Sequence, residues 1–482
     1  MSSSILTTCV ALVALASNSV AQVVPTHSGL VYATLGSQDL KLDLYLPAGG
    51  TAPSPVFLYI HGGGWSGGSR FPIPGPAELA LQQGFAVAAL DYRLTSQAAL
   101  FAPFQVTFPA QIHDVKGAVR WLRANAATYG LDPARFVSFG TSAGGHLSAL
   151  LATSGGVAAL EGDVGGNLAF SSAVQAAADF FGPTDLLHMD DDVTTPPGST
   201  IVHEDPSSPE SKLVGWDQPG QGLGDIKVHL ADPTPPYPAL VQLVTDANPI
   251  TWVDAGDPPM FIGHGTHDVS VAVNQSTKLS AALFAHGVAH DYRAVPGAGH
   301  GLGGPIDSVV VAFASAALNS TSAPVVGTDF CFGDGSAKPC PCGNVSQSGA
   351  RLGCRHSAIV GANLNAVGVA SVSSDSLLLR GDSLPNGNVL FFQGLAPTGG
   401  GTGLLFGDGL LCIGSSIERL GAKTNVQGWS SYPQVGNPSV SAKGGASAGQ
   451  TLYYQVWFRD VTTHCTPAQH NLTNAVAITW LP

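Results

Sequence analysis

Ser142 lies in a pattern suited to a nucleophile. It is the central residue of Gly140-Thr-Ser-Ala-Gly144, which follows a predicted strand at 136–139 and precedes a predicted helix at 143–153. Glycine at the two outer positions removes side chains that would clash in a sharp strand–helix turn, and this turn presents the hydroxyl at the edge of a sheet. A serine hydroxyl attacks a carbonyl carbon once a base takes its proton. The pattern therefore predicts a histidine base and a carboxylate that orients it.

Two downstream loops supply a carboxylate and a histidine. Asp268 ends Gly265-Thr-His-Asp268 after the predicted strand 260–263, and His300 lies in a glycine-rich loop after the predicted strand 292–295. The carboxyl ends of parallel strands meet at one edge of a sheet, where ligand groups collect. We therefore predict that Asp268 orients His300 and that His300 takes the proton from Ser142.

A second glycine-rich segment, His61-Gly-Gly-Gly-Trp65, follows the predicted strand at 56–60. Glycines allow backbone N–H groups to approach a ligand closely, and an oxyanion that forms on a carbonyl needs such donors. The first N–H of the helix after a nucleophile supplies another donor. We predict an oxyanion hole made by the N–H groups of Gly63, Gly64 and Ala143, with His61 as an anchor for the loop.

Other ionisable residues near these motifs are interpreted as structural. His264 and His267 adjoin Asp268 and leave no carboxylate-bearing strand between themselves and the nucleophile, so neither is chosen as the base. Asp179 and Asp185 are expected to accept hydrogen bonds from loop amides. Asp114 and Arg123 are expected to be surface or packing charges. The segment Asp91-Tyr-Arg93 is expected to form a turn with buried hydrogen bonds.

Strand and helix signals alternate through residues 22–320, which predicts a mostly parallel sheet with helices on both faces. A helix is expected at 109–126, where apolar residues recur at spacings of three and four. Further helices are expected at 273–286 and 307–318. Residues 187–257, rich in Pro, Asp and Gly, break this rhythm and are expected to form a cap or a wall of the substrate cleft.

The cysteines predict a second, smaller domain. Of the seven, Cys9 lies near the N-terminus and the other six all lie between 331 and 465. Short β-type runs separated by Gly, Ser and Asn predict an antiparallel all-β sandwich at 328–482, joined through a linker at 321–327. Six cysteines in one region of an exported chain predict disulfides, and the sequence does not choose among the 15 pairings.

The N-terminus and the net charge bear on location and partners. Residues 1–21 resemble a signal peptide, with an apolar stretch too short to span a bilayer and cleavage expected after Ala21. We therefore expect an extracellular or periplasmic protein. The net charge of −13 disfavours nucleic acid as a partner, and no membrane span is expected. No metal or cofactor is expected, because serine-based acyl transfer requires neither.

Several motifs together resemble one family. The N-terminal domain is similar, over residues 28–318, to the bacterial esterase and feruloyl-esterase branch of the α/β-hydrolases, which is related to the hormone-sensitive-lipase-like carboxylesterases. The motifs are His61-Gly-Gly-Gly-Trp65, Asp91-Tyr-Arg-Leu94, Phe108-Pro-Ala-Gln-Ile-His-Asp114, Gly140-Thr-Ser-Ala-Gly-Gly-His146, Gln275-Ser276 and Gly299-His-Gly301. The second domain resembles Cys- and Gly-rich C-terminal modules of exported bacterial proteins.

The resemblance implies an α/β-hydrolase fold and hydrolysis of carboxylic esters, often acetyl or feruloyl groups on plant polysaccharides. Small esters or polysaccharide-linked esters are the expected substrates, and the C-terminal domain is expected to make any contact with a polymer or cell surface. Two alternatives stay open at this point: a serine peptidase of the same fold, and a non-catalytic surface-binding protein. The acyl and alcohol specificity, the role of the C-terminal domain and the oligomeric state also stay open.

Overall fold

The structure is a computed structural model. It describes residues 22–49, 53–193, 198–319, 327–336, 338–346, 351–357, 360–367, 369–373, 375, 377–425, 428–434, 437–460 and 465–482. The expected signal peptide at 1–21 and residues 321–326 of the expected linker lie outside these described residues. Within them, no helix is both long and apolar enough to cross a lipid bilayer.

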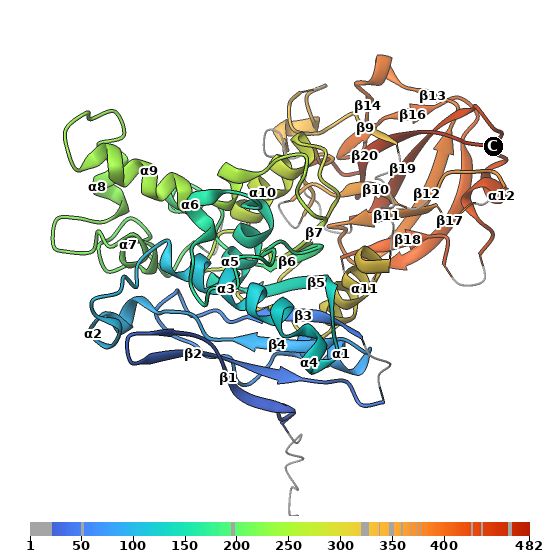
Figure 1. Cartoon of the computed structure of the whole chain (residues 1–482). Helices are drawn as coiled ribbons and strands as arrows, with labels where there is room; N and C mark the ends of the chain where they lie inside the picture. The colour runs from blue at the N-terminus through green and yellow to red at the C-terminus, as the bar shows by residue number, and fades with distance from the viewer. Residues whose placement is uncertain are drawn as a thin grey trace, which may run out of the picture.

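The described part of the N-terminal half contains an eight-stranded sheet in the order β1-β2-β4-β3-β5-β6-β7-β8 (Figure 1). β1 and β2 pair antiparallel at one edge, and the strands from β4 to β8 pair parallel. The predicted mostly parallel sheet is confirmed. Its strands are β1 His27–Leu35, β2 Gln38–Tyr45, β3 Ser54–Ile60, β4 Ala86–Leu90, β5 Leu131–Thr141, β6 Ala176–Phe180, β7 Met260–Gly265 and β8 His290–Val295.

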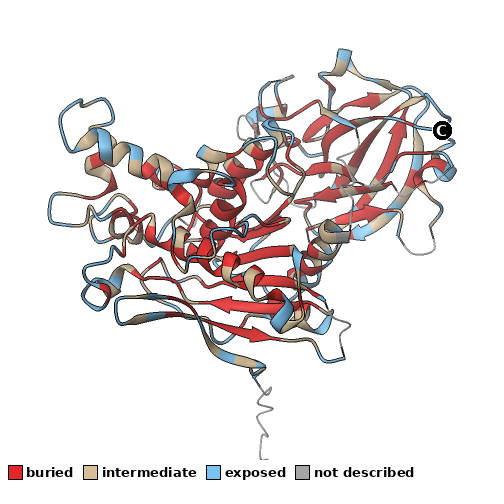
Figure 2. Ribbon diagram, in the orientation of Figure 1, coloured by how far each residue is buried: buried red, intermediate tan, exposed pale blue. Residues whose placement is uncertain are grey.

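Helices cover both faces of this sheet, and the central strands between them are buried (Figure 2). One core cluster joins the sheet to α3, α5 and α10, and a second joins it to α1 and α11. The expected helices at 109–126, 143–153, 273–286 and 307–318 are present with slightly different ends. The bounds are α1 Gly75–Gln82, α3 Ala110–Ala124, α5 Ala143–Thr153, α10 Asn274–Ala285 and α11 Pro305–Asn319.

The segment at 187–257 adds short helices to one side of the sheet (Figure 1). They are α7 Pro209–Val214, α8 Leu223–Val228 and α9 Tyr237–Ala247. Leu213, Ile226 and Val244, one from each helix, are fully buried in the same core cluster as α5. The segment is therefore anchored on the apolar layer that also supports the helix after Ser142.

The C-terminal half forms antiparallel sheets, as its turn-rich pattern predicts. A five-stranded sheet, β17-β12-β19-β20-β9, and a three-stranded sheet, β10-β11-β18, share one core in the described residues. Disulfides join Cys331 to Cys412, Cys340 to Cys354 and Cys342 to Cys465. The strands are β9 Thr328–Phe330, β10 Asn363–Val367, β11 Leu378–Asp382, β12 Gly387–Gly394, β17 Glu418–Asn425, β18 Ser430–Tyr432, β19 Thr451–Arg459 and β20 His470–Thr479.

A buried ionic cluster connects the two halves at β8 and β11. Arg380 Nη1 lies 3.1 Å from Asp291 Oδ2 and its Nε lies 2.9 Å from Asp382 Oδ1. The Trp429 ring centroid lies 4.9 Å from the Arg380 guanidinium carbon and 5.0 Å from that of Arg293. Burial raises the pKa of Asp382, and the nearby Arg380 charge opposes this rise. The edge strand that precedes the His300 loop is thus held by charges from the C-terminal half.

Arg380→Gln should destabilise the protein by about 3 kcal/mol or more, because it leaves the buried carboxylates of Asp291 and Asp382 with Arg293 as their one remaining cation in the cluster. Urea unfolding of the full chain measures the change. Lys443→Gln is the control, since Lys443 pairs with Glu418 on the surface and its loss should leave the midpoint unchanged. An unchanged midpoint for Arg380→Gln would show that the cluster does not hold the two halves together.

Candidate active site

Ser142 occupies a strained turn between β5 and α5. Its φ of 55° and ψ of −125° lie in a region that side-chain-bearing residues rarely adopt. The Ser142 N–H donates to the Phe180 carbonyl at 2.8 Å, and the Ser142 carbonyl accepts from His146 N–H at 3.0 Å. Neighbouring backbone therefore holds the turn on both sides of the serine.

The glycines around Ser142 are required by close backbone contacts. A Cβ at Gly140 would lie 2.0 Å from the Gly144 carbonyl oxygen, and a Cβ at Gly144 would lie 2.1 Å from the Ile60 carbonyl oxygen. Both distances are well below any van der Waals contact. The spacing of glycines seen in the sequence thus has a steric cause in this turn.

The three predicted side chains lie in one hydrogen-bonded row. Ser142 Oγ lies 3.0 Å from His300 Nε2, and His300 Nδ1 lies 2.7 Å from Asp268 Oδ2. Asp268 comes from the loop between β7 and α10, and His300 from the loop between β8 and α11. In this arrangement His300 Nδ1–H donates to Asp268, and Nε2 is left to accept the hydroxyl proton of Ser142. The Phe181 ring centroid lies 4.5 Å from that of His300 and bounds one side of the imidazole.

Asp268 is a buried carboxylate that several donors keep ionised. Its Oδ1 accepts the N–H groups of Ser270 at 2.8 Å and Val271 at 3.0 Å. Burial would raise the pKa of Asp268, but hydrogen bonds from His264 and His300 outweigh it and hold the pKa well below its ordinary value. The Asp268 carboxylate is therefore ionised and can serve as the counter-charge of a protonated His300 imidazole.

His264 is a residue that the sequence analysis left without a part in the site. Its Nε2 faces the Val271 carbonyl oxygen, which can only accept, so Nε2 carries a hydrogen, while Nδ1 lies 2.7 Å from the Ser276 hydroxyl. That Nε2–H donates to the Val271 carbonyl at 2.9 Å and lies 3.3 Å from Asp268 Oδ2. The spacing of four residues between His264 and Asp268, across the end of a buried strand, was the available signal.

The predicted oxyanion-hole residues line the same cavity as Ser142 and His300. This cavity has a volume of about 250 Å³. Gly63 and Gly64 have φ angles of 110° and 57°, which glycine adopts without strain. Ala143 is the first residue of α5, and N–H groups in a first helical turn have no acceptor within their own helix. The site can therefore offer backbone donors to an anion next to Ser142.

A buried histidine connects the glycine loop to α5. Trp65 Nε1–H donates to His146 Nδ1 at 3.2 Å, and His146 Nε2–H donates to the Ala247 carbonyl at 2.8 Å. Burial lowers the pKa of His146 to about 4, so the ring is neutral and keeps both bonds. His61 stacks on Tyr92 with ring centroids 4.4 Å apart. These contacts fix the loop that carries Gly63 and Gly64 relative to α5.

The charged residues near the motifs are mostly buried. Arg93 donates to both carboxylate oxygens of Asp114, with Nη2–Oδ1 at 2.6 Å, which confirms buried hydrogen bonds at the Asp91-Tyr-Arg93 turn. Asp114 and Arg123 are not surface charges: both are buried, and Arg123 donates to backbone carbonyls that include Pro133. Asp114 and Arg123 are therefore packing charges of α3.

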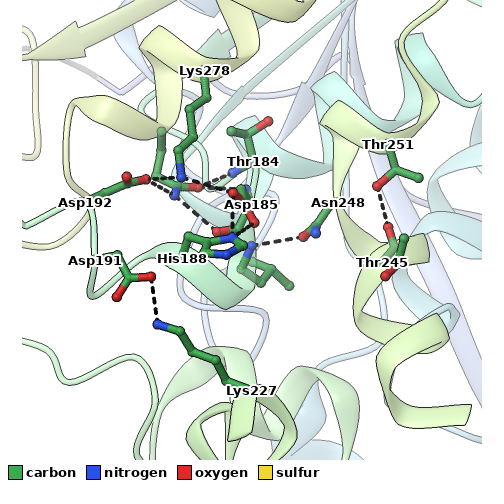
Figure 3. A network of polar contacts seen from close by, with 12 residues as sticks. Thr184, Asp185, His188, Asp191, Asp192, Lys227, Thr245, Asn248, Thr251 and Lys278 are labelled. Atoms are coloured by element: carbon green, nitrogen blue, oxygen red, sulfur yellow. Dashed lines mark hydrogen bonds and ion pairs between the residues drawn. The ribbon is translucent and has the colours of Figure 1, made fainter. Parts of the chain in front are cut away.

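A network of polar contacts around Asp185 corrects one expectation (Figure 3). The N–H groups of Thr184 and Asp185 donate to Gln275 Oε1 at 2.7 and 2.8 Å. The Asp185 carboxylate instead pairs with Lys278 Nζ at 3.0 Å, which also lies 2.8 Å from Asp192. The expectation that Asp185 accepts from loop amides is therefore wrong, because an amide side chain from α10 occupies that position. The network ties α10 to the loop that follows β6.

Among the described residues, no group of three or more His, Cys, Asp or Glu side chains is placed to hold a metal ion. Cys340 and Cys342 are each in a disulfide. The side chains at the site have instead the chemistry of a nucleophile, a base and a hydrogen-bond acceptor.

The parallel sheet, the strained turn at Ser142 and the loops after β7 and β8 define an α/β-hydrolase. A model of the BD-FAE family matches residues 42–283, and the chain belongs to this family of α/β-hydrolase esterases. It is 31% identical over 251 residues to Esterase LipQ of Mycobacterium tuberculosis, a match that covers 51% of this chain and 50% of the relative.

Two further comparisons agree with this family. Carboxylesterase NlhH of Mycobacterium tuberculosis is 32% identical over 236 residues, which is 48% of this chain and 62% of the relative. A solved structure of a truncated carbohydrate esterase from gut microbiota is similar with a TM-score of 0.51 and 29% identity, over 61% of this chain and 96% of that one. The chain thus spans about half the length of the curated relative LipQ.

His264→Phe should lower kcat by roughly 10- to 100-fold with little change in KM, because a loosened Asp268 displaces the imidazole that it orients. Steady-state kinetics on a soluble ester measures both constants. His267→Gln is the control, since His267 is exposed and contacts Thr266 Oγ1. Equal kinetics for the two variants would mean that His264 does not position Asp268.

Asp179→Asn should alter the pH dependence of stability. The Asp179 carboxyl accepts one N–H, from Gly182, and burial raises its pKa from 3.8 to about 7. Between these values the folded protein binds more protons than the unfolded chain, so stability falls as pH rises from about 4 to 7. The variant has no carboxyl to ionise at this position, so at pH 8 its free energy of unfolding should exceed that of the wild type by about 2–4 kcal/mol.

Urea unfolding of Asp179→Asn at pH 5 and pH 8 tests this, with the exposed carboxyl variant Asp163→Asn as the control. A difference in stability between Asp179→Asn and the wild type that is the same at pH 5 and pH 8 would contradict the buried, neutral carboxyl.

Proposed function

We propose that this protein is a serine carboxylesterase in which Ser142, His300 and Asp268 act as a catalytic triad. The observation that carries the proposal is the hydrogen-bonded row from the Ser142 hydroxyl through both nitrogens of His300 to Asp268. Membership of an esterase family supports the reaction class, and the cavity beside Ser142 supplies room for an ester.

In the proposed reaction, Ser142 Oγ attacks the ester carbonyl carbon while His300 Nε2 takes the hydroxyl proton. The carbonyl oxygen becomes an oxyanion that accepts hydrogen bonds from the N–H groups of Gly63, Gly64 and Ala143. Each such donor is worth roughly 10²–10³ in rate. His300 then protonates the leaving alcohol oxygen, which gives an acyl-serine. Water attacks this acyl group with His300 again as base, and the acid and free Ser142 are released.

The proposed substrates are short-acyl, acetyl or feruloyl esters of plant-type polysaccharides, or related small esters. A neighbour described as a carbohydrate esterase supports this class. No cofactor enters the proposed reaction.

We also propose that the chain is exported. Three disulfides among the described residues favour an oxidising compartment, and the pattern at 1–21 is that of a signal peptide. The proposed division into a catalytic domain at 22–320 and an accessory domain at 328–482 follows the change from a parallel sheet to antiparallel sheets. Contact with a polymer or a cell surface is assigned to the accessory domain.

Ser142→Ala should lower kcat/KM for acetyl and feruloyl esters by about 10³-fold or more, because among the described residues Ser142 carries the one hydroxyl bonded to His300 Nε2. Initial rates on a panel of 4-nitrophenyl, acetyl-xylose and feruloyl esters measure the effect. Ser308→Ala, an exposed serine on α11, is the control and should retain wild-type rates. Cleavage of peptide amides in place of esters, or unchanged ester turnover by Ser142→Ala, would contradict the proposal.

A further inference from the structure

One wall of the active-site cavity comes from the segment at 187–257. Most of this wall is apolar, with Ile201, Pro209 and the neighbouring Val271 facing the space in front of Ser142. Glu210 also lines the cavity and, among its described lining residues, is the one carboxylate. A carboxylate at this position is unexpected, because burial costs a charged group more solvation free energy than it costs a hydroxyl or an amide.

Glu210 is held rigidly. It lies in the first turn of α7, which begins after Ser208, whose Oγ accepts the Ser211 N–H at 3.0 Å. The residue before it, Pro209, packs against the oxyanion loop: a Cβ at Gly64 would lie 3.1 Å from Pro209 Cβ. The Glu210 residue is only 3% exposed. Its carboxylate is therefore fixed near the proposed oxyanion hole.

The charge of Glu210 is balanced, but its hydrogen-bonding capacity is not used up. His203 Nδ1 lies 3.1 Å from Glu210 Oε2, and both side chains are buried. Oε2 is enclosed by protein and faces His203, whereas Oε1 is not enclosed in this way and accepts no hydrogen bond from the described residues. Burial would lower the pKa of His203, but Glu210 and Asp190 raise it above its ordinary value. The pair is thus close to neutral overall, while Glu210 Oε1 keeps free lone pairs on the side of the cavity.

We propose that Glu210 is a specificity-determining residue that accepts a hydrogen bond from a hydroxyl group on the alcohol part of the ester. This inference rests on the proposed esterase function. A neutral hydroxyl fits because His203 already neutralises the carboxylate, and free hydroxyls beside an ester bond are characteristic of polyol esters. A site that contains a buried acceptor rejects analogues that lack the donor, because they leave the acceptor unpaired.

Glu210→Gln tests the assignment, because it keeps the size of the side chain and removes the charge. The substrates are a monoacetylated methyl xylopyranoside, which carries hydroxyls beside the ester, and cyclohexyl acetate, which has a ring without hydroxyls. The ratio of kcat/KM for the sugar ester to that for cyclohexyl acetate should fall about tenfold, because a charged acceptor is replaced by a neutral one. Glu204→Gln is the matched control: Glu204 lies in the same segment, pairs with Lys227 and should leave the ratio unchanged.

An unchanged ratio in Glu210→Gln, or an equal fall for both esters, overturns the inference. A second measurement avoids any change at Glu210: Ser142→Ala should bind the xyloside ester at least about tenfold more tightly than cyclohexyl acetate in calorimetry, and equal binding also overturns it. Absence of ester turnover by the wild type would instead refute the proposed function, so the two failures are distinguishable.

Discussion

The proposed site depends on a carboxylate that stays charged inside the protein. Asp268 is buried, and burial of an unpaired charge is costly, so the surrounding loop must supply donors. Two backbone N–H groups satisfy one oxygen, while His264 and His300 face the other. The same contacts that stabilise the charge also fix the direction of the His300 ring. The hydrogen bonds of Asp268 therefore both stabilise its loop and orient the proposed base.

The strained turn at Ser142 needs a rigid frame in the same way. A backbone conformation that is rarely populated persists only where surrounding structure over-determines it. Here the frame consists of close backbone contacts at Gly140 and Gly144, the bond from Ser142 N–H to Phe180, and the buried helix α5. His146 extends this frame to the glycine loop and to the segment at 187–257. The proposed nucleophile and the proposed oxyanion donors are thus held by one continuous set of buried contacts.

The sequence was sufficient where the cause of a feature is local. The turn at Ser142 and the strands and helices beside it follow from glycine spacing and apolar periodicity. The row formed by Ser142, Asp268 and His300 followed from the rule that parallel strands end at one edge. His264 and Gln275 were missed as supports because their partners, Asp268 and the amides at 184–185, are defined only by the folded loops.

Long-range pairings also lay beyond sequence reasoning. The three disulfides and the Arg380 cluster join residues far apart in the chain, and their choice depends on how the C-terminal sheets pack. The cluster also shows that the C-terminal half contacts β8, the strand that leads to His300. Composition alone favours a C-terminal half that is separate from the site. The contact with β8 shows that the two halves are joined next to the strand before His300.

Covalent labelling of the proposed nucleophile is the decisive experiment. The full chain would be treated with a fluorophosphonate, which transfers a phosphonyl group to an activated serine, and then analysed by intact and peptide mass spectrometry. We expect one adduct, on Ser142, with loss of ester hydrolysis in proportion to labelling, and no adduct when His300 is replaced by Ala. Full hydrolytic activity without an adduct on Ser142, or an adduct on another serine that tracks inactivation, would contradict it.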